Sequence, residues 1–316
     1  MTSNSEAEMP HLDQDNYEIS RQIGKGKYAL VFEAMDVLHR RQCALKVFKP
    51  EKKQKRIERE VQILKHLAGG PNIISLFDVV EEVEGIKKGL ALELVDHTDF
   101  RTLFPRFGDD DIRYYMRELL KALQFCHGQG VMHRDVRPHN VVIDHQAKKL
   151  RLIGWGSAAF YTPGTEYSVR ISLWKAPELL LDYQAYDCSL DMWAFGAMFA
   201  SMIFRKEPFF HGTSRSDQLV KISRVLGTEK LFEYVEKYGI ELDREDAQAL
   251  EHVPRREWTS FVREENVRTA NAEAVDFLDR VVRFDHQDRL TADEALNHPY
   301  FCVREVVEGS EEMINE

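Results

Sequence analysis

The first third of the chain alternates short apolar runs with glycine-rich or polar turns, which is the pattern of β-strands. A strand, a glycine turn and a second strand are predicted within residues 23–31, and further strands at 43–48, 73–83 and 89–95. One helix is predicted at 57–67, where apolar residues recur at helical spacing: Ile57, Val61, Leu64 and Leu67.

After a polar break at 96–99 the periodicity becomes helical. Helices are predicted at 110–127, 189–204, 219–226, 231–238, 274–284 and 290–296, with a short strand at 150–153. The longest mostly apolar run, 192–204, is too short to span a bilayer and is bounded by Asp191 and Arg205, so we expect a buried helix. The predicted fold class is α+β, with a β-rich part at 17–95 and a helix-rich part at 96–301.

Composition narrows the class of protein. The 316 residues are 43% hydrophobic and 30% charged, enough for a packed core in one large domain or two lobes. A net charge of −10 argues against a general attraction to nucleic acid or to an anionic membrane. Four scattered cysteines and a polar N-terminus without a secretory signal indicate an intracellular protein, in the cytoplasm or the nucleus. Residues 1–16 are predicted to be a mobile tail, and 302–316 an acidic tail.

One loop concentrates groups that suit phosphoryl transfer. The run His133-Arg134-Asp135-Val136-Arg137-Pro138-His139-Asn140 lies between two apolar runs. An aspartate can orient a hydroxyl and accept its proton, the later asparagine can ligate Mg²⁺, and a base between them can hold a phosphate oxygen. Alone, the same residues also fit a polar turn between two short strands.

Two further features fit a nucleotide site. The turn between the first two strands contains Gly24 and Gly26, and glycines let backbone N–H groups approach a phosphate, although a plain hairpin has the same pattern. Lys46 lies inside an apolar strand, and a buried ammonium needs an anionic partner. Glu60 on the next helix is the candidate partner and Glu58 its competitor, unless Lys46 faces solvent on an edge strand.

A basic cluster precedes and begins that helix: Lys49, Lys52, Lys53, Lys55, Arg56 and Arg59. Most charge runs are solvated surfaces, but in a chain of net −10 a local basic patch can also hold an acidic segment. The sequence leaves both interpretations open.

These features follow one another in order: the glycine turn, Lys46, Glu60, the loop 133–140, Ala176-Pro177-Glu178, the D-x-W-x-x-G run from Asp191 to Gly196, and Arg289. The ordered set resembles the eukaryotic protein kinase family over residues 17–301. Several runs look more closely like the catalytic alpha subunit of casein kinase II: Gly24-Lys25-Gly26-Lys27-Tyr28, Gly69-Gly70-Pro71-Asn72-Ile73-Ile74, 132–140, Trp155, 204–212 and 285–291.

The resemblance implies a two-lobed protein kinase fold that binds ATP and Mg²⁺ between a β-rich N-lobe and a helical C-lobe. The implied catalytic residues are Asp135, Lys46, Glu60, Arg137 and Asn140, and Asn140 would also be the metal ligand. The implied nucleotide contacts are Ile23, Gly24, Lys25, Gly26, Lys27, Tyr28, Ala29, Leu30, Val31, Lys46, and on the hinge Glu93 and Val95.

The resemblance also implies structural pairs and partners. Glu178 would pair with Arg289, and Asp191 would hold the catalytic loop, 133–140, from behind. The family phosphorylates Ser or Thr followed by acidic residues, so the basic cluster, together with Arg170 and Lys175, would bind an acidic protein substrate. A regulatory beta subunit would bind through the sheet of the N-lobe.

The chain departs from the family's pattern in four places. Gly154, in Gly154-Trp155-Gly156, replaces the metal-binding aspartate and offers no side-chain ligand. Arg137 stands where the family has lysine, the strip 169–177 is shorter, and the N-terminal tail lacks an aromatic, basic segment. A loss of about 4 kcal/mol of metal stabilisation corresponds to roughly a thousandfold in rate.

We therefore expect a casein kinase II alpha-like serine/threonine kinase that phosphorylates acidic proteins with weak activity. The alternative is a catalytically inactive pseudokinase that acts as a nucleotide-binding or protein-binding scaffold. In a third case, the site no longer binds nucleotide at all.

Overall fold

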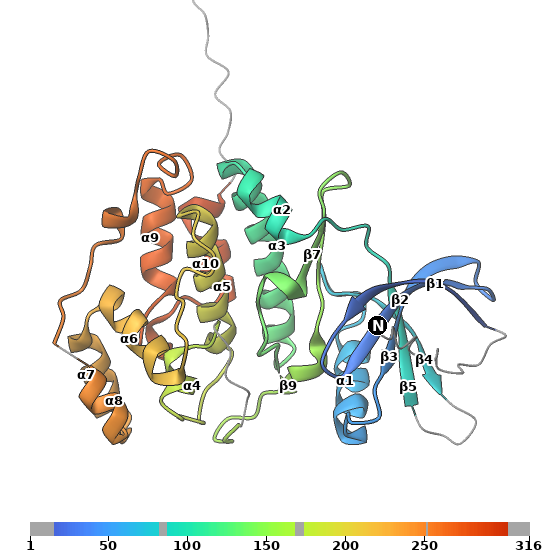
Figure 1. Cartoon of the computed structure of the whole chain (residues 1–316), viewed down its shortest axis with the longest axis horizontal. Coiled ribbons are helices and arrows are strands. Elements are labelled where there is room, and N and C mark those ends of the chain that lie inside the picture. Colours follow the sequence, from blue (N-terminus) through green and yellow to red (C-terminus); the bar gives the residue numbers. More distant parts are fainter. Residues whose placement is uncertain (1–15, 82–86, 168–173, 251, 303–316) are drawn as a thin grey trace, which may run out of the picture.

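Five antiparallel strands form one end of the molecule, in the order β1-β2-β3-β5-β4 (Figure 1). The computed structural model describes residues 16–81, 87–167, 174–250 and 252–302. The strands are β1 Tyr17–Lys25, β2 Ala29–Asp36, β3 Arg41–Phe48, β4 Leu76–Glu81 and β5 Lys87–Glu93. Since β3 pairs with β2 and β5, Lys46 is on a central strand, and the edge-strand alternative is wrong.

Helix α1, Gln54–His66, is the one long helix beside this sheet in the described chain. Its buried side chains are Ile57, Val61, Ile63, Leu64 and the carboxylate of Glu60. An amphipathic helix turns its apolar stripe to the core, and Glu60 falls on that stripe because it follows Ile57 by three residues and precedes Leu64 by four.

The second lobe is mainly helical, as expected (Figure 1). Its helices are α2 Phe100–Leu103, α3 Asp109–Gly128, α4 Pro177–Leu180, α5 Ser189–Ile203, α6 Arg215–Leu226, α7 Thr228–Lys237, α8 Arg244–Ala249, α9 Ala272–Val281 and α10 Ala292–Leu296. The lobe also has two small two-stranded antiparallel sheets: β6 Val131–Met132 pairs with β9 Ala159–Phe160, and β7 Val141–Asp144 forms a hairpin with β8 Lys149–Leu152.

Helix α5 is the centre of this lobe. Every residue from Leu190 to Ile203 is buried, which confirms the prediction of a buried helix. No helix in the described ranges is both long enough and apolar enough to cross a bilayer. All four cysteines lie within the described ranges and are free thiols.

Several predicted boundaries were wrong for local reasons. Helix α6 begins before 219, at Arg215, because Ser214 caps it by accepting a hydrogen bond from the Asp217 amide. Helix α10 begins after 290 because Thr291 and Glu294 form a capping box. The predicted strand 73–83 is shorter, since β4 begins at Leu76; residues 82 and 83 lie outside the described ranges.

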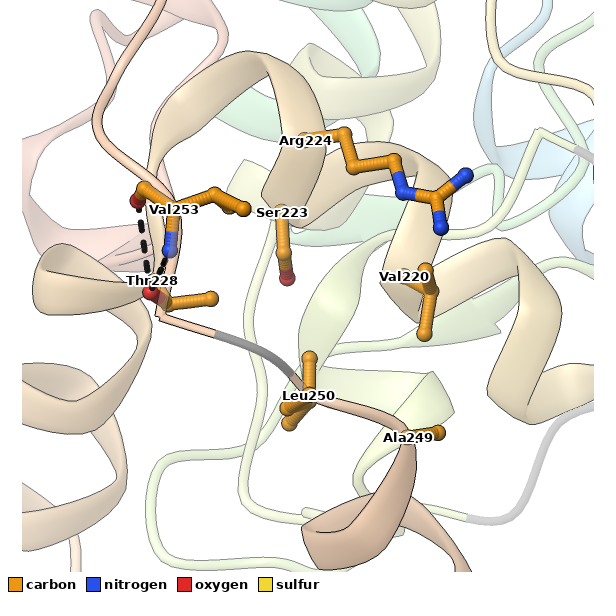
Figure 2. A pocket seen from close by; sticks show the side chains of 7 residues that line it. All are labelled: Val220, Ser223, Arg224, Thr228, Ala249, Leu250 and Val253. Carbon is orange, nitrogen blue, oxygen red and sulfur yellow. Dashed lines mark hydrogen bonds between the residues drawn. The ribbon is translucent and has the colours of Figure 1, made fainter.

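A small pocket lies where the segment after α8 meets α6 and α7 (Figure 2). The Thr228 hydroxyl accepts a hydrogen bond from the Val253 amide at 3.0 Å and donates to its carbonyl at 3.3 Å. The pocket encloses about 10 Å³, which is the lower limit for a single water molecule. This pocket is therefore too small to bind a ligand larger than a water molecule.

A buried ion pair joins α4 to the loop before α10. The guanidinium of Arg289 donates two hydrogen bonds of 2.7 Å to Glu178, and both side chains are fully buried, which confirms the expected pair. Arg289 also donates to the carbonyls of Arg283, Ser189 and Phe284. The pair thus fixes three separate segments of the lobe.

Replacement of Arg289 tests this role. In Arg289→Met the carboxylate of Glu178 stays buried without its partner, so the free energy of unfolding in urea should fall by about 3–5 kcal/mol. The matched control is Arg280→Met, which breaks an exposed pair with Asp276 on α9 and should cost no more than about 0.5 kcal/mol. Equal losses in the two variants would contradict a structural role for the Glu178–Arg289 pair.

Candidate active site

The loop 133–140 runs from β6 to β7 and is held from behind by α5. One carboxylate oxygen of Asp191 accepts a hydrogen bond from the His133 amide at 2.7 Å, and the other accepts one from the Arg134 amide at 2.7 Å. Arg134 has a positive φ of 64°, so the backbone turns sharply here. The expectation that Asp191 holds this loop is confirmed.

The charge state of this support follows from its surroundings. Burial alone raises the pKa of Asp191, but the hydrogen bond from His127, at 3.0 Å, and the charges of His127 and His133 outweigh it and lower the pKa. Burial lowers the pKa of His133, whose ring bonds the Ile153 carbonyl at 2.9 Å and meets Trp155 edge to face. The Asp191 carboxylate and the His133 ring together fix the loop.

Three predicted catalytic residues meet in the loop. The Asn140 amide nitrogen donates to the Asp135 carboxylate at 2.9 Å and to its backbone carbonyl at 2.7 Å. The Nε of Arg137 lies 3.5 Å from the same carboxylate. The Asp135 side chain is 24% exposed, so it remains accessible to a substrate hydroxyl.

Lys46 reaches α1 from the central strand. Its Nζ lies 2.5 Å from Oε1 of Glu60, whose side chain is 2% exposed. The competitor Glu58 instead accepts a hydrogen bond from Gln54 at 3.3 Å. Burial alone raises the pKa of Glu60, but the charges of Lys46 and Lys52 outweigh it, so the pKa lies below its ordinary value.

Lys52 is a functional candidate that the sequence did not single out. Its Nζ lies 2.6 Å from Oε2 of Glu60 and 4.1 Å from the centre of the Phe48 ring, and its side chain is 6% exposed. Burial lowers the pKa of Lys52, although the charge of Glu60 opposes the shift. Neither interpretation of the basic cluster, as a solvated surface or as a surface that holds an acidic segment, applies to Lys52, because its ammonium is buried against Glu60.

The predicted glycine-loop residues lie at the β1–β2 connection. Residues 23–25 end β1, residues 26–28 form the turn, and residues 29–31 begin β2. The Gly26 amide donates to the Ala29 carbonyl at 2.8 Å, and Lys49 Nζ donates to the Gly26 carbonyl at 3.0 Å. A cation therefore lies directly at the turn.

The hinge residues are placed differently from each other. The Glu93 carboxylate pairs with Lys149 at 2.5 Å and with Arg151 at 2.9 Å, so it links β5 to β8. Burial alone raises the pKa of Glu93, but these two hydrogen bonds outweigh it and lower the pKa. Val95 is buried, and its carbonyl bonds to the His97 ring at 3.1 Å. Because the Glu93 carboxylate is already paired with Lys149 and Arg151, a nucleotide bound at the hinge would contact the backbone of Glu93 and not its side chain.

Gly154 and Gly156 join the two halves of the site. Gly154 has a φ of 84°, and the side chain of Asn140 fills the space that a Cβ at Gly154 would occupy. A Cβ at Gly156 would lie 3.2 Å from Oε2 of Glu60 and 3.5 Å from Nζ of Lys52. Lys46, Lys52 and Glu60 together form the lysine–glutamate group. The Gly154-Trp155-Gly156 turn therefore contacts this group through Gly156 and the loop 133–140 through Gly154.

Lys175 was also predicted to belong to the surface that binds an acidic substrate. Lys175 is 6% exposed and donates to the Arg134 carbonyl at 2.5 Å, so its assignment to that surface was wrong. Burial lowers the pKa of Lys175, while the charges of Asp135 and Asp191 oppose the shift. Arg170 lies outside the described residues.

A comparison with protein families completes the description of the site. The family model described as the protein kinase domain matches residues 17–301. Its two-lobed fold, with a sheet in the N-lobe and helices in the C-lobe, is the fold found here. Members of this family transfer phosphate and generally use ATP with Mg²⁺. A match over most of the chain shows that this protein belongs to the protein kinase family.

Proposed function

We propose that this protein is a serine/threonine kinase of the casein kinase II alpha type, with slow phosphate transfer to acidic proteins. The observation that carries the proposal is the 2.5 Å ion pair between Lys46 and Glu60. The Glu178–Arg289 pair is fully buried, whereas Lys46 stays 17% exposed and so remains accessible to an anion. Since apolar residues could replace a buried ion pair without loss of stability, a nucleotide-binding role is the better explanation for the Lys46–Glu60 pair.

The mechanism follows from the positions of the side chains. Asp135 orients the substrate hydroxyl and accepts its proton, because its carboxylate is accessible and is held by Asn140. Lys46, braced by Glu60, holds the α and β phosphates, and Arg137 holds the γ phosphate beside Asp135.

The side chains do not fit a resident Mg²⁺ ion. Gly154 offers no side-chain ligand, so of the two ligands expected from the family only the Asn140 side-chain oxygen is present, beside Gly154, while its amide nitrogen donates to Asp135. Mg²⁺ demands near-octahedral coordination by oxygen. Within 16–81, 87–167, 174–250 and 252–302, no three His, Cys, Asp or Glu side chains are grouped to hold a metal. We therefore assign no step to a metal ion and attribute the slow transfer to its loss.

The substrate and partner classes are part of the proposal. Exposed Lys53, Lys55 and Arg56 at the start of α1, with the half-buried Arg59, support recognition of acidic side chains after the phosphoacceptor. The N-lobe sheet supports binding of a regulatory beta subunit, because Val37 and Leu38, at the β2–β3 turn, are 40% and 73% exposed.

One observation favours a second candidate function, that of a scaffold without transferase activity. The Asn140 side chain occupies the space beside Gly154. A site that holds nucleotide but cannot position the γ phosphate would bind partners without modifying them. The two candidates differ in whether phosphate is transferred.

Transfer of labelled phosphate from ATP to an acidic Ser peptide separates the candidates. Wild type should exceed Asp135→Ala, purified in the same way, and Asp135→Asn should lose about 10²–10⁴-fold because it removes the proton acceptor. If Asp135→Asn transfers as fast as wild type, the role of Asp135 is wrong. If wild type equals Asp135→Ala while ATP still binds, the scaffold function holds instead.

Gly154→Asp tests the cause of the slow transfer. A restored carboxylate should raise the rate with Mg²⁺ by up to roughly a thousandfold, provided that the Asn140 side chain moves aside. Gly154→Asn is the matched control, since asparagine has similar size and also tolerates a positive φ but carries no charge. A gain of equal size in the asparagine variant would refute the metal explanation.

A further inference from the structure

We infer that this kinase binds the free nucleoside triphosphate without a divalent cation, and that Lys52 supplies the charge which makes this binding favourable. The nucleotide is taken to lie where the proposed function places it, and no transfer step is assumed. The family generally uses Mg²⁺ with ATP, so this chain would differ in the chemical form of the nucleotide that it binds.

The first step concerns the charge carried by Glu60 and its two lysines. Lys46 and Lys52 each occupy one oxygen of the same carboxylate, at 2.5 and 2.6 Å. One carboxylate neutralises one ammonium, so the group keeps one net positive charge. Lys46 is 17% exposed and Lys52 only 6%, so Lys46 is the end that an anion reaches. A lone Lys46–Glu60 pair would have no net charge to offer.

The second step concerns the protonation of Lys52. Its amine lies 2.6 Å from a carboxylate and over the face of Phe48 at 4.1 Å. Burial lowers the pKa of Lys52, and both contacts oppose that shift because they favour the ammonium over the neutral amine. Lys52 therefore offsets the charge of Glu60 without having to touch the phosphates.

The third step concerns Gly154, at the side of the Gly154-Trp155-Gly156 turn that faces the loop 133–140. A carboxylate at Gly154 would repel free phosphates unless a cation lay between them. Glycine removes that repulsion and removes the ligand at the same time. The Asn140 side-chain oxygen lies in the space beside Gly154, and the amide nitrogen of the same residue donates to Asp135. Both effects of Gly154 favour the free triphosphate.

The two sides are in contact, which makes them one site. A Cβ at Gly156 would lie 3.5 Å from Lys52 Nζ, so the turn that carries Gly154 packs directly on the lysine–glutamate group. Lys49 adds a further cation at the Gly26 carbonyl. The phosphates are thus expected between cationic groups on the sheet side and an uncharged Gly154.

The test is the dissociation constant of ATP, measured by calorimetry on the full chain with EDTA and with Mg²⁺. Wild type should bind ATP in EDTA within about threefold of its affinity in Mg²⁺, a difference below 1 kcal/mol. Tighter binding by tenfold or more in Mg²⁺ would overturn the inference. Absence of binding in both solutions would overturn it as well.

Variants of Lys52 test its role as a positioning residue. Lys52→Met should weaken binding about tenfold in EDTA and less in Mg²⁺, whereas Lys52→Arg, which keeps the charge, should restore binding in EDTA. The matched control is Lys65→Met, an exposed lysine on the same helix, which should leave both constants unchanged. Equal weakening in both solutions would mean that Lys52 is only structural and would overturn its assigned role.

Variants of Gly154 test whether the missing carboxylate makes binding independent of the metal ion. Gly154→Asp should make binding depend on Mg²⁺ by at least tenfold, whereas Gly154→Asn should remain independent of the metal. If both variants behave alike, the charge argument is wrong. Peptide phosphorylation is read separately: binding in EDTA without any transfer refutes the proposed kinase function alone, and transfer together with Mg²⁺-dependent binding refutes this inference alone.

Discussion

One buried carboxylate supports the rest of the site. Asp191 lies at the start of α5, inside a helix that is buried from Leu190 to Ile203, and it accepts hydrogen bonds from two consecutive amides of the loop 133–140. Because α5 is packed on all sides, the loop inherits the rigidity of the core of the lobe. The positions of Asp135, Arg137 and Asn140 depend on this support, whichever residue stands at position 154.

A second constraint is electrostatic and lies across the Gly154-Trp155-Gly156 turn. Glu60 is buried, so it persists as a carboxylate only with cationic partners, and it has two. Trp155 holds the turn in place by donating to the Leu152 carbonyl at 3.0 Å and by packing on His133. The small residues at 154 and 156 let both halves of the site approach the turn closely.

Local sequence patterns and the family resemblance together predicted most of the residue pairs at the site. Glu60 could be preferred to Glu58 since it shares the apolar stripe of α1, and the Glu178–Arg289 pair followed from the family resemblance. Lys52 could not be found in this way, because a run of basic residues has the same composition whether one member folds inward or all face solvent. The same limit applied to Lys175, whose place depends on the Arg134 carbonyl, distant in sequence. The first residues of α6 and α10, Arg215 and Ala292, were predicted wrongly because the capping residues before them, Ser214 and Thr291, are polar and carry no periodicity.

The residues that match the kinase pattern differ in whether they serve the fold or the binding of nucleotide. Asp191 and the Glu178–Arg289 pair hold separate backbone segments of the second lobe together, so they serve the fold whether or not the chain is catalytic. Lys46 is different, because a lysine placed on a central strand costs desolvation that an apolar residue would avoid. The backbone at Gly154 also keeps a left-handed conformation that aspartate and asparagine tolerate best among residues with a side chain. At the metal position the departure from the family's pattern is the single side chain of Gly154, and the Asn140 side chain fills the space beside it. On the phosphate-binding side the Lys46–Glu60 pair is present. This combination favours a nucleotide site altered in its metal requirement over a site that no longer binds nucleotide.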